Sequence, residues 1–194
     1  MKKAFRTIAG KLDANSPVIL SLSAVSLLML IWNMLSKGWV NGLFAVYYTS
    51  FSDPMQYVRL LSHCIVHQDM THYTGNFLLI LAIGPLVEEK YGSAYVLLTI
   101  TATSVLAGLI NIFFFRNIIL LGASGIAFML ILMGSFSNIR EGKIPLTFLL
   151  AAILYIGNEI IAGIFATDNI SHLSHIIGGL CGAISGLSFH KKPY

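Results

Sequence analysis

The sequence predicts an all-α membrane protein in which six helices cross the bilayer. Of its 194 residues, 56% are hydrophobic and only 10% are charged, and the mean hydropathy is +0.80. Soluble domains carry about 25% charged residues and disordered chains are poor in apolar residues, so the composition excludes both classes. A helix needs roughly 20 apolar residues to cross the hydrocarbon core. Six windows of that order are free of Lys, Arg, Asp and Glu, apart from Glu159 in the fifth: 14–36, 70–87, 91–115, 117–139, 144–166 and 169–190.

The positive charges predict which side of the membrane holds the chain ends, because Lys and Arg collect on the cytoplasmic side. With six spans, the twelve positive residues divide nine against three: Lys2, Lys3, Arg6, Lys11, Lys90, Arg140, Lys143, Lys191 and Lys192 on the side of both ends, and Lys37, Arg59 and Arg116 on the other. We therefore expect residues 1–16 and 191–194 to be cytoplasmic tails of one domain, 17–190, in the inner (plasma) membrane. This topology accounts for the net charge of +4, and we expect no nucleic-acid partner.

The connection between the first two spans, residues 36–61, is the longest outside the membrane and is rich in aromatic residues. It contains Trp39, Phe44, Tyr47, Tyr48, Phe51 and Tyr57. Aromatic rings favour the membrane–water interface. The sequence therefore predicts a first outer loop that is embedded in the membrane.

The cysteines and histidines do not form a metal motif. Cys64 and Cys181 lie in apolar surroundings at no motif spacing, which indicates neither a disulfide framework nor a zinc site. His63 and His67 are four residues apart, a spacing that can bind zinc. Because no acidic ligand or catalytic glutamate accompanies them, we expect no metal and no cofactor.

Polar side chains within the predicted spans are costly and point to function. Ser124, His175 and Asn76 lie eight, seven and seven residues beyond Arg116, Asp168 and Asp69, each on a span that enters from the outer side. At 1.5 Å per residue, all three are expected about 10 Å below the outer surface. Three spans thus bring a serine, a histidine and an asparagine to one level.

Ser124 is expected at the start of a short helix. A helix from Ser124 to residue 139 would be only about 24 Å long, shorter than the hydrocarbon core. It is therefore expected to begin below the surface, after a non-helical approach over residues 117–122. At that position free backbone N–H groups and the helix dipole can stabilise an oxyanion, and Gly122 and Gly125 leave room for a substrate carbonyl.

His175 precedes a stripe of glycines at four-residue spacing, Gly178, Gly182 and Gly186. Such a stripe lets another helix approach closely. If it packs on the Ser124 helix, His175 can reach Ser124 as a general base. Phe128, four residues after Ser124, would then stack against the imidazole.

His72 and Asn76 are four residues apart and share a helix face. Both can donate hydrogen bonds to an oxyanion, and His63 and His67 continue the series towards the surface. Each feature also has a simpler interpretation: a serine between glycines can serve helix packing, and an intramembrane histidine or Glu159 can be a hydrogen-bonded core group.

Together these motifs resemble the rhomboid family of intramembrane serine proteases, over roughly residues 55–190. The family's second span carries His-x-x-x-His-x-x-x-x-His-x-x-x-Asn, its fourth opens with Gly-x-Ser-Gly, and its sixth carries His-x-x-Gly-x-x-x-Gly. The matching residues here are His63, His67, His72 and Asn76, then Gly122, Ser124 and Gly125, then His175, Gly178 and Gly182. Arg59 and Glu88 also match family positions, whereas Phe128 stands where tyrosine is common.

The resemblance implies a six-span rhomboid-like bundle and a catalytic dyad of Ser124 and His175 without a third carboxylate. It also implies an oxyanion hole from His72, Asn76 and the backbone N–H of Ser124, with His67 as a supporting residue. The expected partners are transmembrane-protein substrates within the lipid bilayer. Two alternatives stay open: a rhomboid-like protein that binds partner helices without cleaving them, and a small transporter that uses Glu159 and the histidines as a proton relay.

Overall fold

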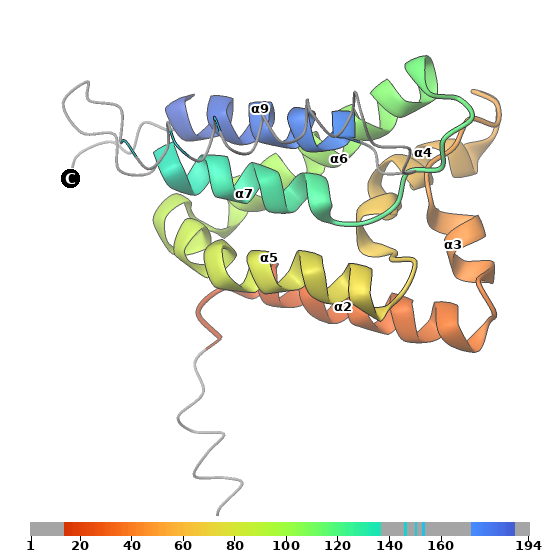
Figure 1. Ribbon diagram of the computed structural model, residues 1–194, viewed down its shortest axis with the longest axis horizontal. Coiled ribbons are helices and arrows are strands. Elements are labelled where there is room, and N and C mark those ends of the chain that lie inside the picture. The colour runs from red at the N-terminus through yellow and green to blue at the C-terminus, as the bar shows by residue number, and fades with distance from the viewer. Residues whose placement is uncertain (1–13, 137–145, 147–149, 151–152, 154–171, 189–194) are drawn as a thin grey trace, which may run out of the picture.

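The protein is helical throughout the part of the chain that the structure describes. The computed structural model describes residues 14–136 and 172–188, together with residues 146, 150 and 153. The elements in order are α2 (Pro17–Leu35), α3 (Trp39–Phe44), α4 (Pro54–Ser62), the 3₁₀ turn η1 (His63–Ile65), α5 (Met70–Tyr91), α6 (Ser93–Phe114), α7 (Ser124–Phe136) and α9 (His172–Ser188) (Figure 1). Within this part the β-structure is one isolated bridge, between Val46 and Leu120.

Three of the helices, α2, α5 and α6, are long and apolar enough to cross a membrane, and α7 and α9 are shorter apolar helices. This finding confirms a helical membrane protein. The predicted fifth span, 144–166 with Glu159, lies outside the described residues apart from three single positions, as do residues 1–13 and 189–194. The count of six spans and the cytoplasmic tails therefore stay predictions.

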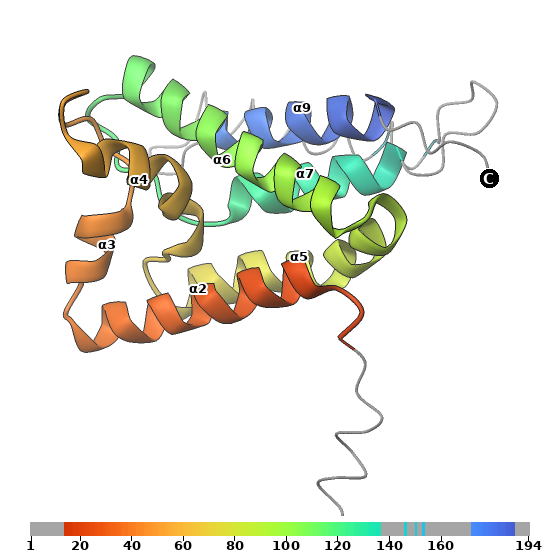
Figure 2. The same ribbon diagram turned by 180° about the vertical axis from the view of Figure 1, so that it is seen from behind.

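Helix α7 lies at the centre of the bundle. It packs against α9 on one side and α5 on the other, and α2 lies along α5 on the outside (Figure 1). Helix α6 crosses obliquely over α7 and α9 on the far side of the bundle, which faces the viewer in Figure 2. Accordingly, most of α7 is buried, with Met129, Leu130 and Met133 among the least exposed side chains.

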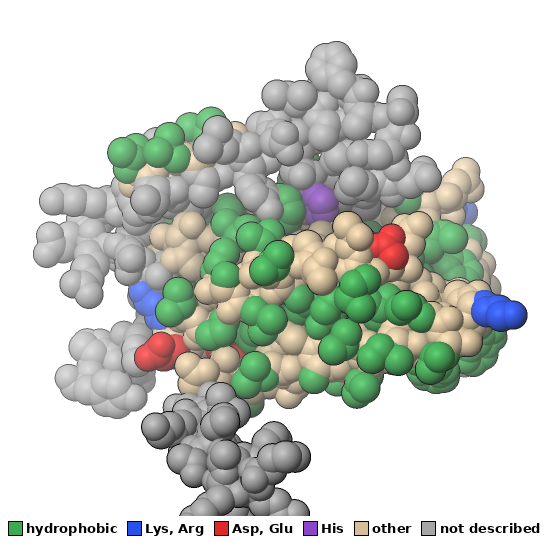
Figure 3. Space-filling view, turned by 60° about the horizontal axis from the view of Figure 1, so that its bottom comes forward, with side chains coloured by type: hydrophobic (Ala, Val, Ile, Leu, Met, Phe, Trp, Pro, Cys, Tyr) green, Lys and Arg blue, Asp and Glu red, His purple; other side chains and the backbone are tan. Residues whose placement is uncertain are grey.

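The surface formed by α2 and α5 is apolar, as expected of a surface that faces lipid. Hydrophobic side chains are spread over this face, and Lys and Arg side chains lie towards its two ends (Figure 3). Large apolar side chains such as Leu28, Leu78 and Leu86 are exposed on it. Exposed apolar surface of this extent belongs in a bilayer rather than in water.

The outer connection, residues 36–61, is not a plain loop, because α3 and the first part of α4 form within it. Arg59 holds it together: its Nε donates to the carbonyl of Leu43 at 3.1 Å, and its guanidinium lies 4.4 Å from the ring centre of Tyr47. Nη1 of Arg59 also lies 3.1 Å from Oδ2 of Asp53, the N-cap of α4. The backbone N–H of Met55, followed by the hydroxyl of Thr49 and the Arg59 guanidinium, lowers the pKa of Asp53.

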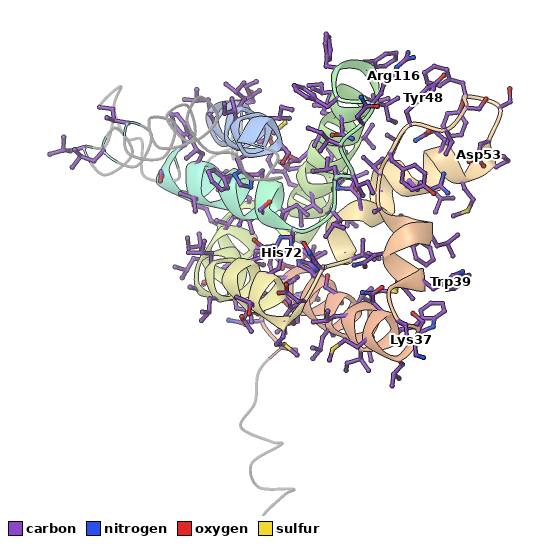
Figure 4. All side chains as sticks on the ribbon, turned by 45° about the vertical axis from the view of Figure 1, so that its right-hand side comes forward. Lys37, Trp39, Tyr48, Asp53, His72 and Arg116 are labelled. Atoms are coloured by element: carbon purple, nitrogen blue, oxygen red, sulfur yellow. The ribbon has the colours of Figure 1, made fainter. Side chains whose placement is uncertain are left out.

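The outer connection also carries exposed aromatic residues, as expected for the membrane interface. Trp39 is 59% exposed and lies near Lys37 at the turn between α2 and α3 (Figure 4). Midway along the connection, Tyr48 lies under Arg116, whose guanidinium carbon is 4.3 Å from the ring centre (Figure 4). Aromatic and basic side chains together are typical of this zone.

The first turn of α2 is capped by a side chain from another helix. Glu88, near the end of α5, accepts hydrogen bonds from the backbone N–H groups of Val18 and Ile19, both at 2.9 Å. These amides have no acceptor within their own helix, and a carboxylate at a helix N-terminus also interacts favourably with the dipole. Glu88 is 2% exposed, so this cap fixes α2 to α5 inside the bundle.

The glycine stripe of α9 packs directly on the backbone of α7. A Cβ atom on Gly178 would overlap the carbonyl oxygen of Gly125, and one on Gly182 would overlap that of Met129. The same atom on Gly186 would lie 2.7 Å from Cβ of Phe136. The predicted close approach of the two helices is therefore confirmed, and it places their first turns side by side.

Replacing Glu88 by Ala is expected to lower the free energy of unfolding by about 1–3 kcal/mol, because two backbone donors lose their charged acceptor. Unfolding in mixed detergent micelles, followed by circular dichroism, measures this change. The control is Glu89→Ala, which removes the same charge from an exposed neighbour. Equal stability of the two variants would contradict the capping role of Glu88.

Replacing Gly178 by Ala is expected to destabilise the protein by about 1–3 kcal/mol, because the added methyl group meets a backbone carbonyl that no rotamer change can move. The matched control is Gly179→Ala, where an added Cβ would have its nearest neighbour at 3.8 Å, Cγ of Leu132. Thermal unfolding of both variants in the same detergent provides the comparison. A Gly178→Ala variant as stable as the control would show that the helices can separate freely.

Candidate active site

A pocket of about 860 Å³ opens between α5, α7 and α9. Its lining includes His72 and Asn76 from α5, Ser124 from the start of α7, and Ser174 and His175 from the first turn of α9. Residues 118–121, which lead towards α7, form another part of the wall. The structure thus brings the serine, the two histidines and the asparagine singled out in the sequence into one pocket.

Ser124 is the first residue of α7, as the sequence predicts. The preceding residues 115–123, here called the approach segment, contain no helix. Gly122 in this segment has a φ of 109°, a left-handed conformation that glycine adopts most easily. Ser124 therefore lies at a helix start that is reached by an irregular backbone inside the protein.

Hydrogen bonds from three directions hold the approach segment. Leu120 exchanges two hydrogen bonds of 2.9 Å with Val46 of the outer connection. The amide Nδ2 of Asn111, on α6, donates to the carbonyl of Ile118 at 2.9 Å. The N–H of Gly122 donates to the carbonyl of His63 at 2.9 Å. An irregular segment at membrane depth needs such partners for its polar groups.

The residue immediately before the serine is held by a histidine side chain. The N–H of Ala123 donates to Nε2 of His67 at 3.2 Å. His67 is fully buried and lies edge-on to His72, with 5.2 Å between ring centres. Its carbonyl in turn accepts from Nδ2 of Asn41, whose N–H donates to Oδ1 of Asn33. His67 therefore fixes the backbone next to Ser124.

His72 and Asn76 converge on the backbone just before Ser124. A Cβ atom on Gly122 would lie 2.6 Å from Nε2 of His72 and 3.6 Å from Nδ2 of Asn76. Figure 4 shows His72 on the side of α5 that faces the approach segment. A larger residue at position 122 would displace the His72 imidazole, so the glycine is required by space as well as by conformation.

Asn76 carries a buried donor that no other described residue satisfies. Its side chain is 8% exposed, and Nδ2 has no hydrogen-bond partner within the described part of the chain. Buried donors of this kind are rare because they forfeit their hydrogen bonds with water. A donor kept in this state beside a serine is suited to an oxygen that carries negative charge.

His175 lies over the first turn of α7. Its imidazole stacks on the ring of Phe128, with 4.4 Å between ring centres and 12° between planes. Phe128 is one turn after Ser124, and the contact between Gly178 and Gly125 brings the two helices together just below. The stacking expected from the sequence is present, and it fixes the plane of the imidazole in the pocket that Ser124 also lines.

His63 and His67 do not continue the helical series of His72 and Asn76, contrary to the expectation from the sequence. Helix α5 begins at Met70, and the two histidines lie before it, in η1 and in the extended segment that follows. Nε2 of His63 lies 3.0 Å from the carbonyl oxygen of Ser104. The Nε2 atoms of both histidines thus contact backbone groups, and the two side chains position chain segments.

Several residues that line the pocket were not predicted from the sequence. Gln68, Asp69, Thr71, Asn117 and Ser174 also line the pocket, and the nearness of the first three to His72 in the chain was the available signal. Glu159 and its neighbour Asn158 lie outside the described residues, and of His172 only the backbone is described, as the start of α9.

This arrangement has the parts that acyl transfer requires: a serine at a helix start, an imidazole in the same pocket, and donors beside the serine. A comparison with protein-family models matches the Rhomboid domain over residues 54–192, a range that includes every side chain of the pocket. A comparison with individual curated proteins found no match. The family match covers well over half of the chain, and the chain belongs to the rhomboid family.

Proposed function

We propose that this protein is an intramembrane serine endopeptidase that cleaves peptide bonds in or near transmembrane segments of other membrane proteins. Rhomboid proteins are generally intramembrane serine proteases, although inactive members exist. The observation that carries the proposal is the shared pocket of Ser124, His175, His72 and Asn76, contributed by three helices. A protein that only binds helices has no need of this combination.

In the proposed reaction, His175 accepts the hydroxyl proton of Ser124 while Oγ attacks the carbonyl carbon of the substrate peptide bond. The carbonyl oxygen becomes an oxyanion, which accepts hydrogen bonds from His72, from Nδ2 of Asn76 and from the N–H of Ser124. His175 then gives its proton to the leaving amine as the C–N bond breaks. Water, activated by His175, hydrolyses the acyl-enzyme and restores the serine.

The stacking of Phe128 on His175 supports a dyad that works without a third residue. In a triad, a carboxylate orients the histidine. Among the described residues that line the pocket, Asp69 is the one carboxylate, and its Oδ1 accepts the backbone N–H of His72 at 2.8 Å. The flat ring contact at 4.4 Å provides an alternative means of holding the His175 imidazole in one plane.

The substrate must unwind before it reacts, because the carbonyls of a membrane helix are hydrogen-bonded within the helix. Glycine, proline and small residues lower the cost of unwinding. We therefore infer that substrates carry such residues near the outer end of their membrane span. The pocket, with a polar wall and an apolar wall, suits an extended segment better than an intact helix.

Two other functions are weaker. A non-catalytic rhomboid-like protein would bind helices without using Ser124, and the family includes inactive members. A transporter would depend on Glu159, which lies outside the described residues. Neither function accounts for the buried, unsatisfied donor of Asn76 beside Ser124.

We expect a fluorophosphonate probe to label Ser124 in the purified protein, because the probe reacts with a serine that a neighbouring base activates. Mass spectrometry of the labelled protein identifies the residue. Ser124→Ala and His175→Ala should both abolish labelling, whereas Ser174→Ala, at the neighbouring position in the pocket, should retain it. A folded, monodisperse protein that resists the probe would favour the non-catalytic alternative.

We expect Asn76→Ala to lower kcat by about 10²–10³-fold, the usual effect of losing one oxyanion donor. Stability should change little, since Nδ2 makes no hydrogen bond to the described residues. Cleavage of a model transmembrane substrate in liposomes measures kcat, with thermal unfolding measured in parallel. Thr74→Ala is the control, because this exposed threonine bonds only to carbonyls of its own helix. Unchanged turnover in Asn76→Ala would refute the oxyanion role.

A further inference from the structure

The pocket has two chemically different walls at its rim. On the α5 side stand Gln68, Asp69 and Thr71, all exposed and polar. Residues 118–121 contribute isoleucine and leucine side chains to another part of the lining. Asp69 is the one side chain with a full charge among the described residues that line the pocket. Whatever enters the pocket therefore meets a negative charge on one side only.

The Asp69 carboxylate is held in place and is not neutralised by a basic side chain. As the N-cap of α5, its Oδ1 accepts the N–H of His72 at 2.8 Å. Within the described residues, the recorded salt bridge joins Arg59 to Asp53, and Asp69 pairs with no lysine or arginine. The nearest titratable group in the pocket is His72, one helical turn away. The second carboxylate oxygen is thus available to a ligand.

Asp69 lies on the same helix as the two proposed oxyanion donors, His72 and Asn76. It lies one turn before His72 and two turns before Asn76, on the outer end of α5. Nδ2 of Asn76, buried and unsatisfied, indicates that a ligand oxygen belongs deeper in the same pocket. A substrate whose carbonyl reaches Asn76 and His72 therefore occupies the same pocket that Asp69 lines.

We propose that Asp69 selects substrates that carry a lysine or arginine close to the cleaved bond. This inference rests on the proposed function. A cation attracts the carboxylate more strongly at the membrane interface than in bulk water, because the effective dielectric constant is lower there. Lysine and arginine are sparse on the outer side of membrane proteins, so such a preference restricts cleavage to a small class of substrates.

A charge scan of a model substrate tests the proposal. The full-length protein is reconstituted in liposomes with transmembrane substrates that carry a single Lys, Gln or Glu at each of the three positions on either side of the cleaved bond. We expect at least one position where the Lys substrate has a kcat/KM on the order of tenfold above that of the Glu substrate, the combined effect of gaining and opposing an exposed charge pair. In Asp69→Asn this ratio should fall close to one.

Asparagine is a suitable replacement because it caps helices as well as aspartate does. Asp69→Ser, which also caps, provides a second uncharged variant. The ratio is compared within each variant, so a general loss of rate cancels. Glu89→Gln removes an exposed carboxylate at the opposite end of α5 and should leave the ratio unchanged.

The outcomes separate this inference from the function on which it rests. Cleavage that is indifferent to charge at every position, or a Lys preference that persists in both Asp69 variants, overturns the role of Asp69 and leaves the protease proposal intact. Absence of cleavage together with absence of fluorophosphonate labelling overturns both.

Discussion

The contact between the backbones of α7 and α9 is the constraint on which the rest of the site depends. At Gly178 and Gly182 no side chain separates the helices, and the carbonyls of Gly125 and Met129 fill the space. Because the contact begins one turn after His175, the imidazole lies over Phe128 and lines the pocket that holds Ser124. If the helices were farther apart, Ser124 and His175 would no longer line the same pocket.

A second requirement is an irregular backbone that stays fixed at membrane depth. The approach segment meets this requirement through main-chain bonds to Val46 and His63 and through the imidazole of His67. These partners come from the outer connection and from the segment before α5, both of which Arg59 and the caps of α4 and α5 help to order. The backbone leading to Ser124 is therefore held in place by segments that lie far from it in the sequence.

Much of this arrangement could be predicted from local sequence patterns. We expected a short helix that begins at Ser124, a helix contact from the spacing of Gly178 and Gly182, and ring stacking from the position of Phe128, and all three are present. The three long apolar helices α2, α5 and α6 coincide with charge-free windows, whose length reflects the thickness of the bilayer.

Other features could not be predicted, because they depend on contacts between distant segments. The spacing of His63 and His67 suggested a helix, but their roles come from carbonyls and amides more than 40 residues away. Backbone groups are the same in every residue, so a sequence carries no sign of which ones will pair. The helices α3 and α4 within the outer connection could not be predicted for a similar reason. Arg59 stabilises them through the carbonyl of Leu43 and the ring of Tyr47.

The nature of the contact at Gly178 limits how this protein can change during evolution. When two side chains clash, a smaller residue at the partner position can relieve the clash. Here the opposing atom is the main-chain oxygen of residue 125, which every amino acid possesses. No compensating substitution at position 125 can therefore rescue a larger residue at position 178. Other positions of the two helices can vary, whereas position 178 must stay glycine.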